Sequence, residues 1–204
     1  NYGDVYTIPN NNTTLTAQWI TGNEVTVTNT LSADSTVEFQ SMSPSRCLIR
    51  YDDNEVVRRN TNTISTFKKN YSLGTHDTTI VSESDDLTNF DNAFDKGTTT
   101  KIDCSKVKAT YLTSPMGNGF ENITDFVFPA NLANISTSEG VLSGCKKLTN
   151  IAFPTVYCDI SSPESFLANS TFVNGLELPY TLNFVPMVSV DGQTGIEEIK
   201  RNEI

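Results

Sequence analysis

One period of 25 residues runs through the C-terminal half of this chain. Aligning the sequence with itself at that offset superimposes three segments with apolar residues at the first, fourth and sixth positions and a proline at the seventh: 123–129 (ITDFVFP), 148–154 (LTNIAFP) and 173–179 (VNGLELP). The whole chain of 204 residues has eight prolines, so three at one position of one period indicate a true repeat. The C-terminal half is therefore predicted to repeat one structural unit.

The pattern LxxLxL at a period of about 20–29 residues is typical of leucine-rich repeats, which place it on a short strand. We expect each of the three segments to form such a strand, with its first, fourth and sixth residues facing the core. The proline that follows closes the strand, because it has no N–H to offer to a parallel ladder.

The segments between these strands also correspond. Ile135 aligns with Ile160, and 141–142 (VL) aligns with 166–167 (FL). Residues 162–164 (SPE) have the pattern of a helix N-terminus, with a capping serine, a proline in the first turn and a carboxylate that the helix dipole favours. Each repeat is therefore predicted to be a strand, a bend, and a brief helix or helical turn.

Upstream of the three regular copies the pattern is less regular. Thr99, Ile102 and Cys104 follow it at a spacing of 24 but without the proline, which we interpret as an irregular first repeat. Before them, residues 86–94 have apolar side chains at helical spacing. Because terminal repeats of a solenoid are atypical, we expect this segment to be a helix that covers the open end of the array.

The run 141–154 (VLSGCKKLTNIAFP) resembles the BspA-type leucine-rich repeats of bacterial surface proteins. Those repeats carry a phenylalanine-rich helix, a Gly-Cys pair and an Ile-x-x-Pro-like strand end. The chain departs from them at Leu142, where the family has Phe, and at Ser170, where the next copy lacks the cysteine. The resemblance implies a leucine-rich-repeat solenoid over residues 83–182.

Residues 20–82 have a different texture, with short runs of Val, Thr, Ile and Phe separated by polar turn residues. Alternation of apolar and polar residues predicts six strands: 24–29, 36–41, 47–51, 56–58, 64–68 and 78–81. Short strands joined by polar turns are typical of a small β-sandwich. The expected fold class is thus mostly β with short helices, a sandwich followed by a short solenoid.

Two further stretches resemble known modules. Residues 48–56 (LIRYDDNEV), together with 67–74 and 78–81, are similar to a degenerate PKD-like domain, which implies that 20–82 is a spacer. Residues 1–19 end in LTAQW and resemble the closing strand of the Listeria–Bacteroides repeat, a surface β-repeat. Residues 183–204 are expected to be a C-terminal cap or tail.

Charge and hydropathy bear on the partners. The net charge of −10 argues against nucleic acid as a partner, because that binding depends on clustered Lys and Arg. No stretch approaches the roughly 20 apolar residues of a membrane-spanning helix, so we expect no membrane insertion. The chain begins at Asn1 rather than Met, which favours a processed or truncated piece.

Residues suited to catalysis are sparse. We expect His76, the single histidine, to be a solvated turn residue, since no nucleophile-elbow motif accompanies it. The four cysteines have no CxxC spacing and are expected to be buried thiols, with a Cys104–Cys145 disulfide as the alternative. Carboxylates cluster at 52–55 and 83–86 and could offer oxygens to calcium, but neither cluster has EF-hand spacing. We therefore expect no enzymatic activity, no cofactor and no metal.

The remaining functional candidate is the exposed side of the repeat strands. The third and fifth residues of each strand point away from the core, which selects Asp125, Val127, Asn150, Ala152, Gly175 and Glu177 as a candidate binding face. This face lacks the Trp, Tyr and Arg that usually anchor interfaces, so a plain solvated sheet is the competing interpretation.

The family resemblances imply a non-enzymatic extracellular or cell-surface protein of a bacterium. Its repeats would serve adhesion, binding a protein or glycan ligand on a host or neighbouring cell. The alternative is a structural protein of a phage virion, in a capsid or tail fibre built from the same modules. An accessory domain of a carbohydrate-active enzyme is a third hypothesis.

Overall fold

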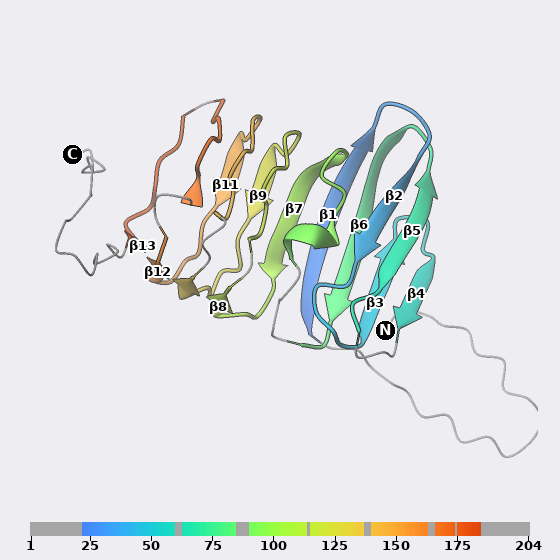
Figure 1. The fold of residues 1–204 in the computed structure, drawn as a ribbon, viewed down its shortest axis with the longest axis horizontal. Coiled ribbons are helices and arrows are strands. Elements are labelled where there is room, and N and C mark those ends of the chain that lie inside the picture. The colour runs from blue at the N-terminus through green and yellow to red at the C-terminus, as the bar shows by residue number, and fades with distance from the viewer. Residues whose placement is uncertain are drawn as a thin grey trace, which may run out of the picture.

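The computed structural model is nearly all β, and it describes residues 22–59, 63–84, 90–113, 115–136, 140–162, 166–173 and 175–184 (Figure 1). The first six strands are β1 (Asn23–Leu31), β2 (Ser35–Gln40), β3 (Cys47–Tyr51), β4 (Val56–Arg59), β5 (Thr66–Tyr71) and β6 (Gly74–Ser82). After the short 3₁₀ helix η1 (Asp91–Ala93) come β7 (Thr99–Lys106), β8 (Tyr111–Leu112), β9 (Asp125–Val127), β10 (Asn134–Ile135), β11 (Asn150–Ala152), β12 (Cys158–Ile160) and β13 (Leu182–Phe184). The predicted mostly-β class is confirmed, with less helix than we expected.

All six strands predicted in the N-terminal half are present. In β1 the buried residues alternate with less buried ones, so that Val25 and Val27 face the core while Thr26 and Thr28 face the other side. β3 has the same alternation around Ile49. Alternation with a period of two places one side of each strand on the core, and this pattern was visible in the sequence.

The largest sheet has seven strands and crosses the boundary that we expected between residues 82 and 83. Its order is β11-β9-β7-β1-β6-β3-β4, with β7, β9 and β11 mutually parallel. β1 pairs antiparallel with β6 on one side and with β7 on the other, with Val27 opposite Thr78 and Ile102 respectively. The N-terminal strands and the repeat strands therefore form one surface, as Figure 1 shows.

This pairing removes the open end for which we expected a helical cap. Residues 85–89 lie outside the described part of the chain, and η1 is a single 3₁₀ turn rather than the helix predicted over 86–94. It lies beside β2, with Phe90 and Phe94 buried and their ring centroids 5.4 Å apart. The edge of β7 that a cap would have covered is instead paired with β1.

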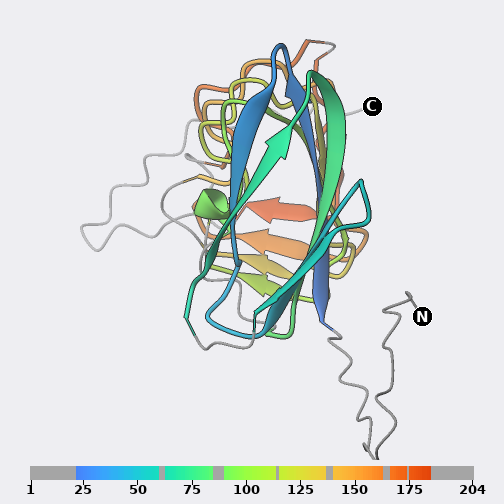
Figure 2. The same ribbon diagram turned by 90° about the vertical axis from the view of Figure 1, so that its right-hand side faces the viewer.

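A second layer covers the core side of the N-terminal strands. β2 and β5 form an antiparallel pair that lies over β1, β6 and β3, and Figure 2 shows the two layers side on. Phe39 and Tyr71 from this pair pack against Tyr51 of β3, with ring centroids 6.2 and 6.3 Å from it. A separate sandwich over 20–82 is not confirmed, because its larger sheet and its buried core continue into the C-terminal part.

The C-terminal part is a β-solenoid of about three turns. One side is the parallel ladder of β7, β9 and β11, and another is the four-stranded sheet of order β13-β12-β10-β8. Residues paired across these ladders are 23 to 25 apart in sequence, as for Tyr111 with Asn134 and Asp125 with Asn150. The period in the sequence is thus the length of one turn.

A third side of the solenoid stacks without strands. Gly119 N donates to Ser143 O at 2.7 Å, and Gly144 N donates to Ala168 O at 2.8 Å, so backbone bonds join successive turns here too. On this side residues 116–119 and 141–144 form bends and turns, and Phe166 has helical backbone before the turn at 167–169. Residues 163–165, which include most of the helix start predicted at 162–164, lie outside the description. At 116–119 and 141–144 the expected helix or helical turn is therefore a bend followed by a turn.

Each of these turns ends on a residue with left-handed backbone. Gly119, Gly144 and Asn169 have φ of 74°, 75° and 58°, and they lie 25 residues apart. Glycine and asparagine are the residues that adopt this conformation at low cost. Phe120 and Cys145, which follow the two glycines, are buried, and Ser170 after Asn169 is half-buried. The glycine of the Gly-Cys pair therefore sets the backbone conformation that places Cys145 in the core.

The third repeat departs from the first two. Phe128 is buried and Phe153 is half-buried, whereas Leu178 at the same position is 38% exposed. Residues 175–179 form no strand, so the strand predicted over 173–179 is wrong. The physical reason is Gly175, whose φ of 78° breaks the extended backbone after the isolated bridge between Leu148 and Phe172.

The remaining expectations concern cysteines and termini. All four cysteines are buried as thiols: Cys47, Cys104, Cys145 and Cys158. The expected terminal strand over 1–19 lies outside the described residues. In the expected C-terminal cap or tail over 183–204, Asn183 and Phe184 belong to β13 and the rest lies outside the description.

Candidate binding face

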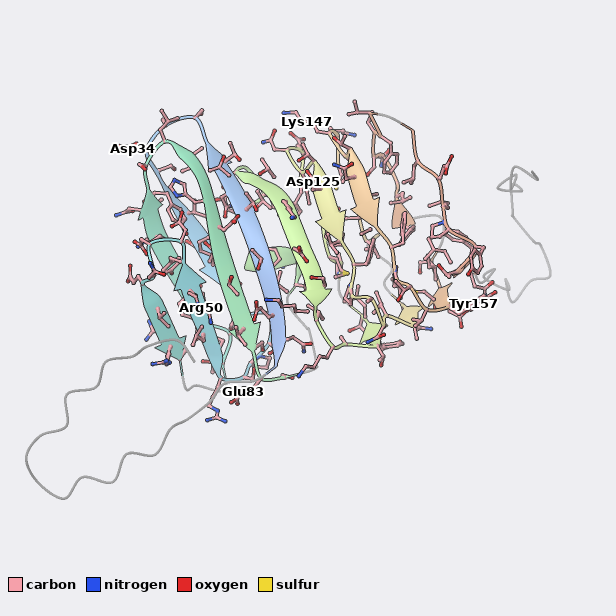
Figure 3. The ribbon with its side chains drawn as sticks, turned by 180° about the vertical axis from the view of Figure 1, so that it is seen from behind. Asp34, Arg50, Glu83, Asp125, Lys147 and Tyr157 are labelled. Atoms are coloured by element: carbon pink, nitrogen blue, oxygen red, sulfur yellow. The ribbon has the colours of Figure 1, made fainter. Side chains whose placement is uncertain are left out.

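The side of the seven-stranded sheet that faces away from the core is a broad polar surface, which we call the outer face (Figure 3). Strand register and alternating burial assign to it Leu48 and Arg50 from β3, Val56 and Arg58 from β4, Glu24, Thr26, Thr28 and Thr30 from β1, Thr75, Asp77, Thr79 and Val81 from β6, Lys101, Asp103 and Lys106 from β7, Asp125 and Val127 from β9, and Asn150 and Ala152 from β11. None of these side chains is aromatic. Both halves of the chain contribute to this one face.

Four of the six predicted face residues lie together on it. Asn150 lies directly opposite Asp125, and Ala152 lies opposite Val127. The Asn150 side-chain amide donates to Asp125 Oδ1 at 2.7 Å, which fixes the carboxylate across the two turns. The other two, Gly175 and Glu177, are exposed but do not belong to a strand, so they do not extend this ladder.

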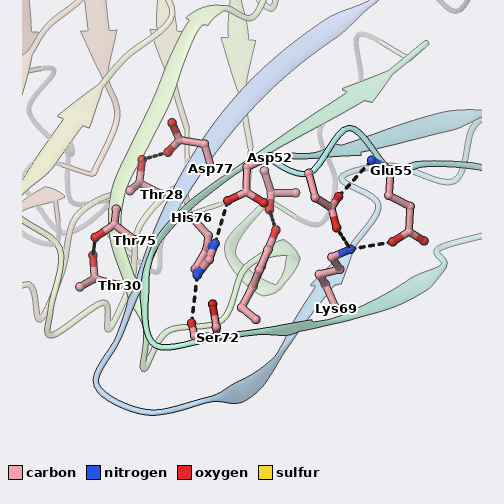
Figure 4. Close-up of polar contacts among 12 residues, drawn as sticks. Thr28, Thr30, Asp52, Glu55, Lys69, Ser72, Thr75, His76 and Asp77 are labelled. Carbon is pink, nitrogen blue, oxygen red and sulfur yellow. Dashed lines mark hydrogen bonds and ion pairs between the residues drawn. The ribbon is translucent and has the colours of Figure 1, made fainter.

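Rows of hydroxyl groups on β1 and β6 continue the face, and sequence reasoning missed them. Thr28 Oγ1 donates to Asp77 Oδ1 at 2.6 Å, and the hydroxyls of Thr30 and Thr75 are 3.3 Å apart (Figure 4). The signal was present in the sequence, because 24–30 (EVTVTNT) alternates and puts every threonine on one side. These mutual hydrogen bonds hold the hydroxyls in fixed positions.

Two lysines of the outer face are paired with carboxylates of the same face. Lys106 Nζ is 2.6 Å from Glu24 Oε1, which joins β7 to β1. Lys101 Nζ is 3.8 Å from Asp103 Oδ2. Burial raises the pKa of Asp103, but hydrogen bonds from Ser105 outweigh it and the pKa lies below its usual value. The carboxylate is therefore charged at neutral pH, and the face carries both signs.

The chemistry of this face suits a polar ligand. Hydroxyl, amide and carboxylate groups lie on neighbouring strands, which are about 4.8 Å apart in a sheet, so the face presents both donors and acceptors at the spacing of the strands. A flat ligand rich in hydroxyl or amide groups could bond to several of them at once. A flat sheet surface of this kind offers contact area across several strands.

A shallow hollow of about 350 Å³ lies away from the outer face, near the last described turn. Phe153, Pro154, Glu177, Leu178 and Pro179 line it. The two prolines are those that the sequence repeat placed at the strand ends, so this hollow is a product of the period. Two tyrosines of the same turns are largely exposed, Tyr157 at 61% and Tyr180 at 89%.

The acidic cluster at 52–55 contacts a lysine of the same chain. Lys69 Nζ contacts the carboxylates of Asp53 and Glu55 and lies 4.9 Å from the centre of the Tyr51 ring. The hydrogen bond from Lys69 lowers the pKa of Asp53, and the bonds to both carboxylates raise the pKa of Lys69. These internal ion pairs account for the first cluster without a bound ion.

The second cluster is described in part. Glu83 pairs with Arg46 at 2.6 Å, and Asp85 and Asp86 lie outside the described residues. Within the described ranges, no three His, Cys, Asp or Glu residues lie close enough to hold a metal ion. These contacts give no support for a calcium site at the first cluster, and most of the second cluster lies outside the described residues.

Among the groups that could act as nucleophile or base, the histidine is placed differently from our expectation and the cysteines are buried as expected. His76 is a residue of β6, and its side chain is 16% exposed, so the prediction of a solvated turn residue is wrong. Burial raises the pKa of Cys47 and of Cys158 to about 11, and it raises that of Cys104 as well. A protonated buried thiol is a poor nucleophile, so these three cysteines serve packing.

No helix among the described residues is long and apolar enough to cross a membrane. Comparison with protein-family models, with curated proteins and with solved structures gives no match to this chain.

Proposed function

We propose that this protein is a non-enzymatic binding module of a bacterial cell-surface or secreted protein, and that it presents the outer face to a protein or glycan on a host or neighbouring cell. The observation that carries the proposal is the seven-stranded sheet, which joins the repeat strands to β1, β6, β3 and β4 in one broad surface. Its side chains are ordered by hydrogen bonds across the strands, as between Asn150 and Asp125.

We also propose that the turns are leucine-rich repeats of the BspA type. The turn length of 23 to 25 residues and the burial of Ile123, Phe126 and Phe128 support this assignment. The regular left-handed position at Gly119 and Gly144 gives the Gly-Cys motif a structural reason. The N-terminal half, which resembles a PKD-like spacer in sequence, would hold these turns in a fixed orientation through the pairing of β1 with β7.

A binding experiment on two charge-matched variants tests the proposal. The purified chain is applied to a printed array of bacterial and host-cell glycans and to immobilised extracellular-matrix proteins. Asp125→Lys changes the middle of the outer face, and Glu38→Lys makes the same change in charge on β2, in the other layer. We expect Asp125→Lys to weaken binding about tenfold or more, equivalent to roughly 1.4 kcal/mol, and Glu38→Lys to leave it unchanged.

Two results would contradict the proposal. If the unmodified chain binds no probe of either array, adhesion through this module is wrong. If Asp125→Lys and Glu38→Lys weaken binding equally, the chain binds, but not through the outer face. A circular dichroism melt of both variants verifies that each is folded at the temperature of the assay.

A further inference from the structure

The single histidine of the chain joins two turns at one end of the N-terminal half (Figure 4). His76 Nδ1 lies 2.7 Å from Oδ2 of Asp52, which is in the turn between β3 and β4. His76 Nε2 lies 2.9 Å from the carbonyl oxygen of Ser72, which is in the turn between β5 and β6. The ring therefore bridges two chain segments that are separate in sequence.

Both partners of the ring are acceptors. A backbone carbonyl accepts hydrogen bonds and cannot donate them, and the same holds for an ionised carboxylate. A neutral imidazole has one N–H and can satisfy one of the two, whereas an imidazolium has an N–H on each nitrogen. The contacts of His76 with Asp52 and Ser72 can both be hydrogen bonds only when the ring is protonated.

The surroundings of the ring also favour a positive charge. Tyr71 stacks on it, with ring centroids 4.3 Å apart and planes 15° apart, and the face of an aromatic ring attracts a cation. The Tyr71 hydroxyl is 2.6 Å from Thr78 Oγ1, which fixes the ring in place. Burial lowers the pKa of His76, but the hydrogen bonds to Asp52 and Ser72 outweigh burial and raise the pKa above its ordinary value of 6.5.

The other titratable groups at this end have partners of their own. They are Asp77, which accepts from Thr28 on the outer face, Lys69, which is held by Asp53 and Glu55, Tyr51, which lies under Lys69, and Asp34, which accepts from the amide of Leu73. Asp52 is thus the carboxylate that bonds to the ring.

We propose that His76 is a pH-sensitive clip, which holds the β3–β4 turn against the β5–β6 turn when the ring is protonated and releases one of them when it is neutral. The proposal does not depend on the binding function. Because protonation is easier in the folded chain, the clip stabilises the fold fully below about pH 6.5, and this contribution is lost as the pH rises through the folded-state pKa. The two turns at this end of the molecule are therefore held together more stably in mildly acidic than in alkaline solution.

An NMR titration tests the clip directly, because one histidine gives one unambiguous set of ring signals. We expect a midpoint above about 6.5 in the full chain. Asp52→Asn removes the charged acceptor and is expected to lower the midpoint. Asp77→Asn removes a carboxylate that faces the opposite side of the same strand and is expected to leave the midpoint unchanged.

The melting temperature gives a second readout. Between about pH 8 and about pH 5.5 the unmodified chain is expected to gain about 2–4 °C relative to Asp52→Asn. A midpoint at or below about 6.5 in the unmodified chain would overturn the proposal. Equal midpoints in the unmodified chain and in Asp52→Asn would overturn it as well, since the bond to Asp52 would then have no effect on protonation.

Discussion

The two halves of this molecule share one sheet but are held together in different ways. In the N-terminal half, β1 and β6 have nine residues each and pair antiparallel along their whole length. In the solenoid, β9 and β11 have three residues each, and backbone bonds outside the strands also join successive turns, as from Gly144 N to Ala168 O. The comparison shows that the first strand of a short repeat array can pair with a long strand that is not part of the repeat.

The largest effect that we predict comes from the middle of the solenoid. Phe126 of β9 is 1% exposed, and the centroid of its ring lies 4.9 Å from that of Phe128. Phe126→Ala should therefore lower the free energy of unfolding by about 3–5 kcal/mol. Leu178→Ala, at an exposed position of the last described turn, should cost less than about 1 kcal/mol. Urea unfolding followed by circular dichroism measures both, and equal losses would contradict the gradient of burial along the array.

A similar loss in the other half tests whether the halves unfold together. Phe39 of β2 is fully buried in the core that extends into the solenoid, so Phe39→Ala should also cost about 3–5 kcal/mol. Because the sheet and the core are continuous, both Phe39→Ala and Phe126→Ala should shift one cooperative transition. The appearance of a second transition in either variant would show that the halves are separate units.

A smaller effect distinguishes a buried hydroxyl from an exposed one. Tyr71→Phe removes the bond to Thr78 and leaves a buried hydroxyl without its partner, which should cost about 1 kcal/mol. Tyr111→Phe, at a half-exposed position of β8 in the solenoid, is the matched control and should change stability by less than about 0.5 kcal/mol. The two melting temperatures are compared at one pH near neutrality, and the idea fails if Tyr111→Phe is the more damaging change.

The smallest effect concerns the outer face. Asn150→Asp replaces an amide donor with a carboxylate beside Asp125, and like charges on paired strands repel by roughly 0.2–1 kcal/mol. We expect a loss near the lower end because Asn150 is exposed. Salt at about 1 M should restore most of it, since screening is strong there. A loss that does not respond to salt would mean that Asn150 is held by something other than this contact.

Sequence alone located most strands because each one had to bury one side. The alternation of Val25 and Val27 with threonines placed β1, and the repeated Phe126 and Ile151 placed β9 and β11. It could not assign the partners of β1. The pairing of Glu24 with Lys106 joins residues more than 80 apart, and alternation carries no information about which edge a strand will find.

The errors have local causes. Copies 123–129 and 173–179 look alike in apolar spacing, but a single glycine with left-handed backbone, Gly175, ends the strand pattern in the second of them. Sequence spacing also suggested a helical segment in each repeat, whereas residues 141–144 form a bend that ends at Gly144. At the candidate site, the repeat predicted Asp125 and Asn150. The contact of His76 with Asp52 joins residues 24 apart in sequence, and no motif in the sequence marks it.

The series Gly119, Gly144 and Asn169 has a consequence for how such an array can change in length. Each of these residues ends its turn with the same left-handed backbone, and in a solenoid each turn contacts only the turns next to it. A duplicated unit of 25 residues, cut at this position, would meet on both sides the junctions that already exist between the present turns. Growth or loss by whole turns would then lengthen or shorten the outer face while leaving its attachment to β1 untouched.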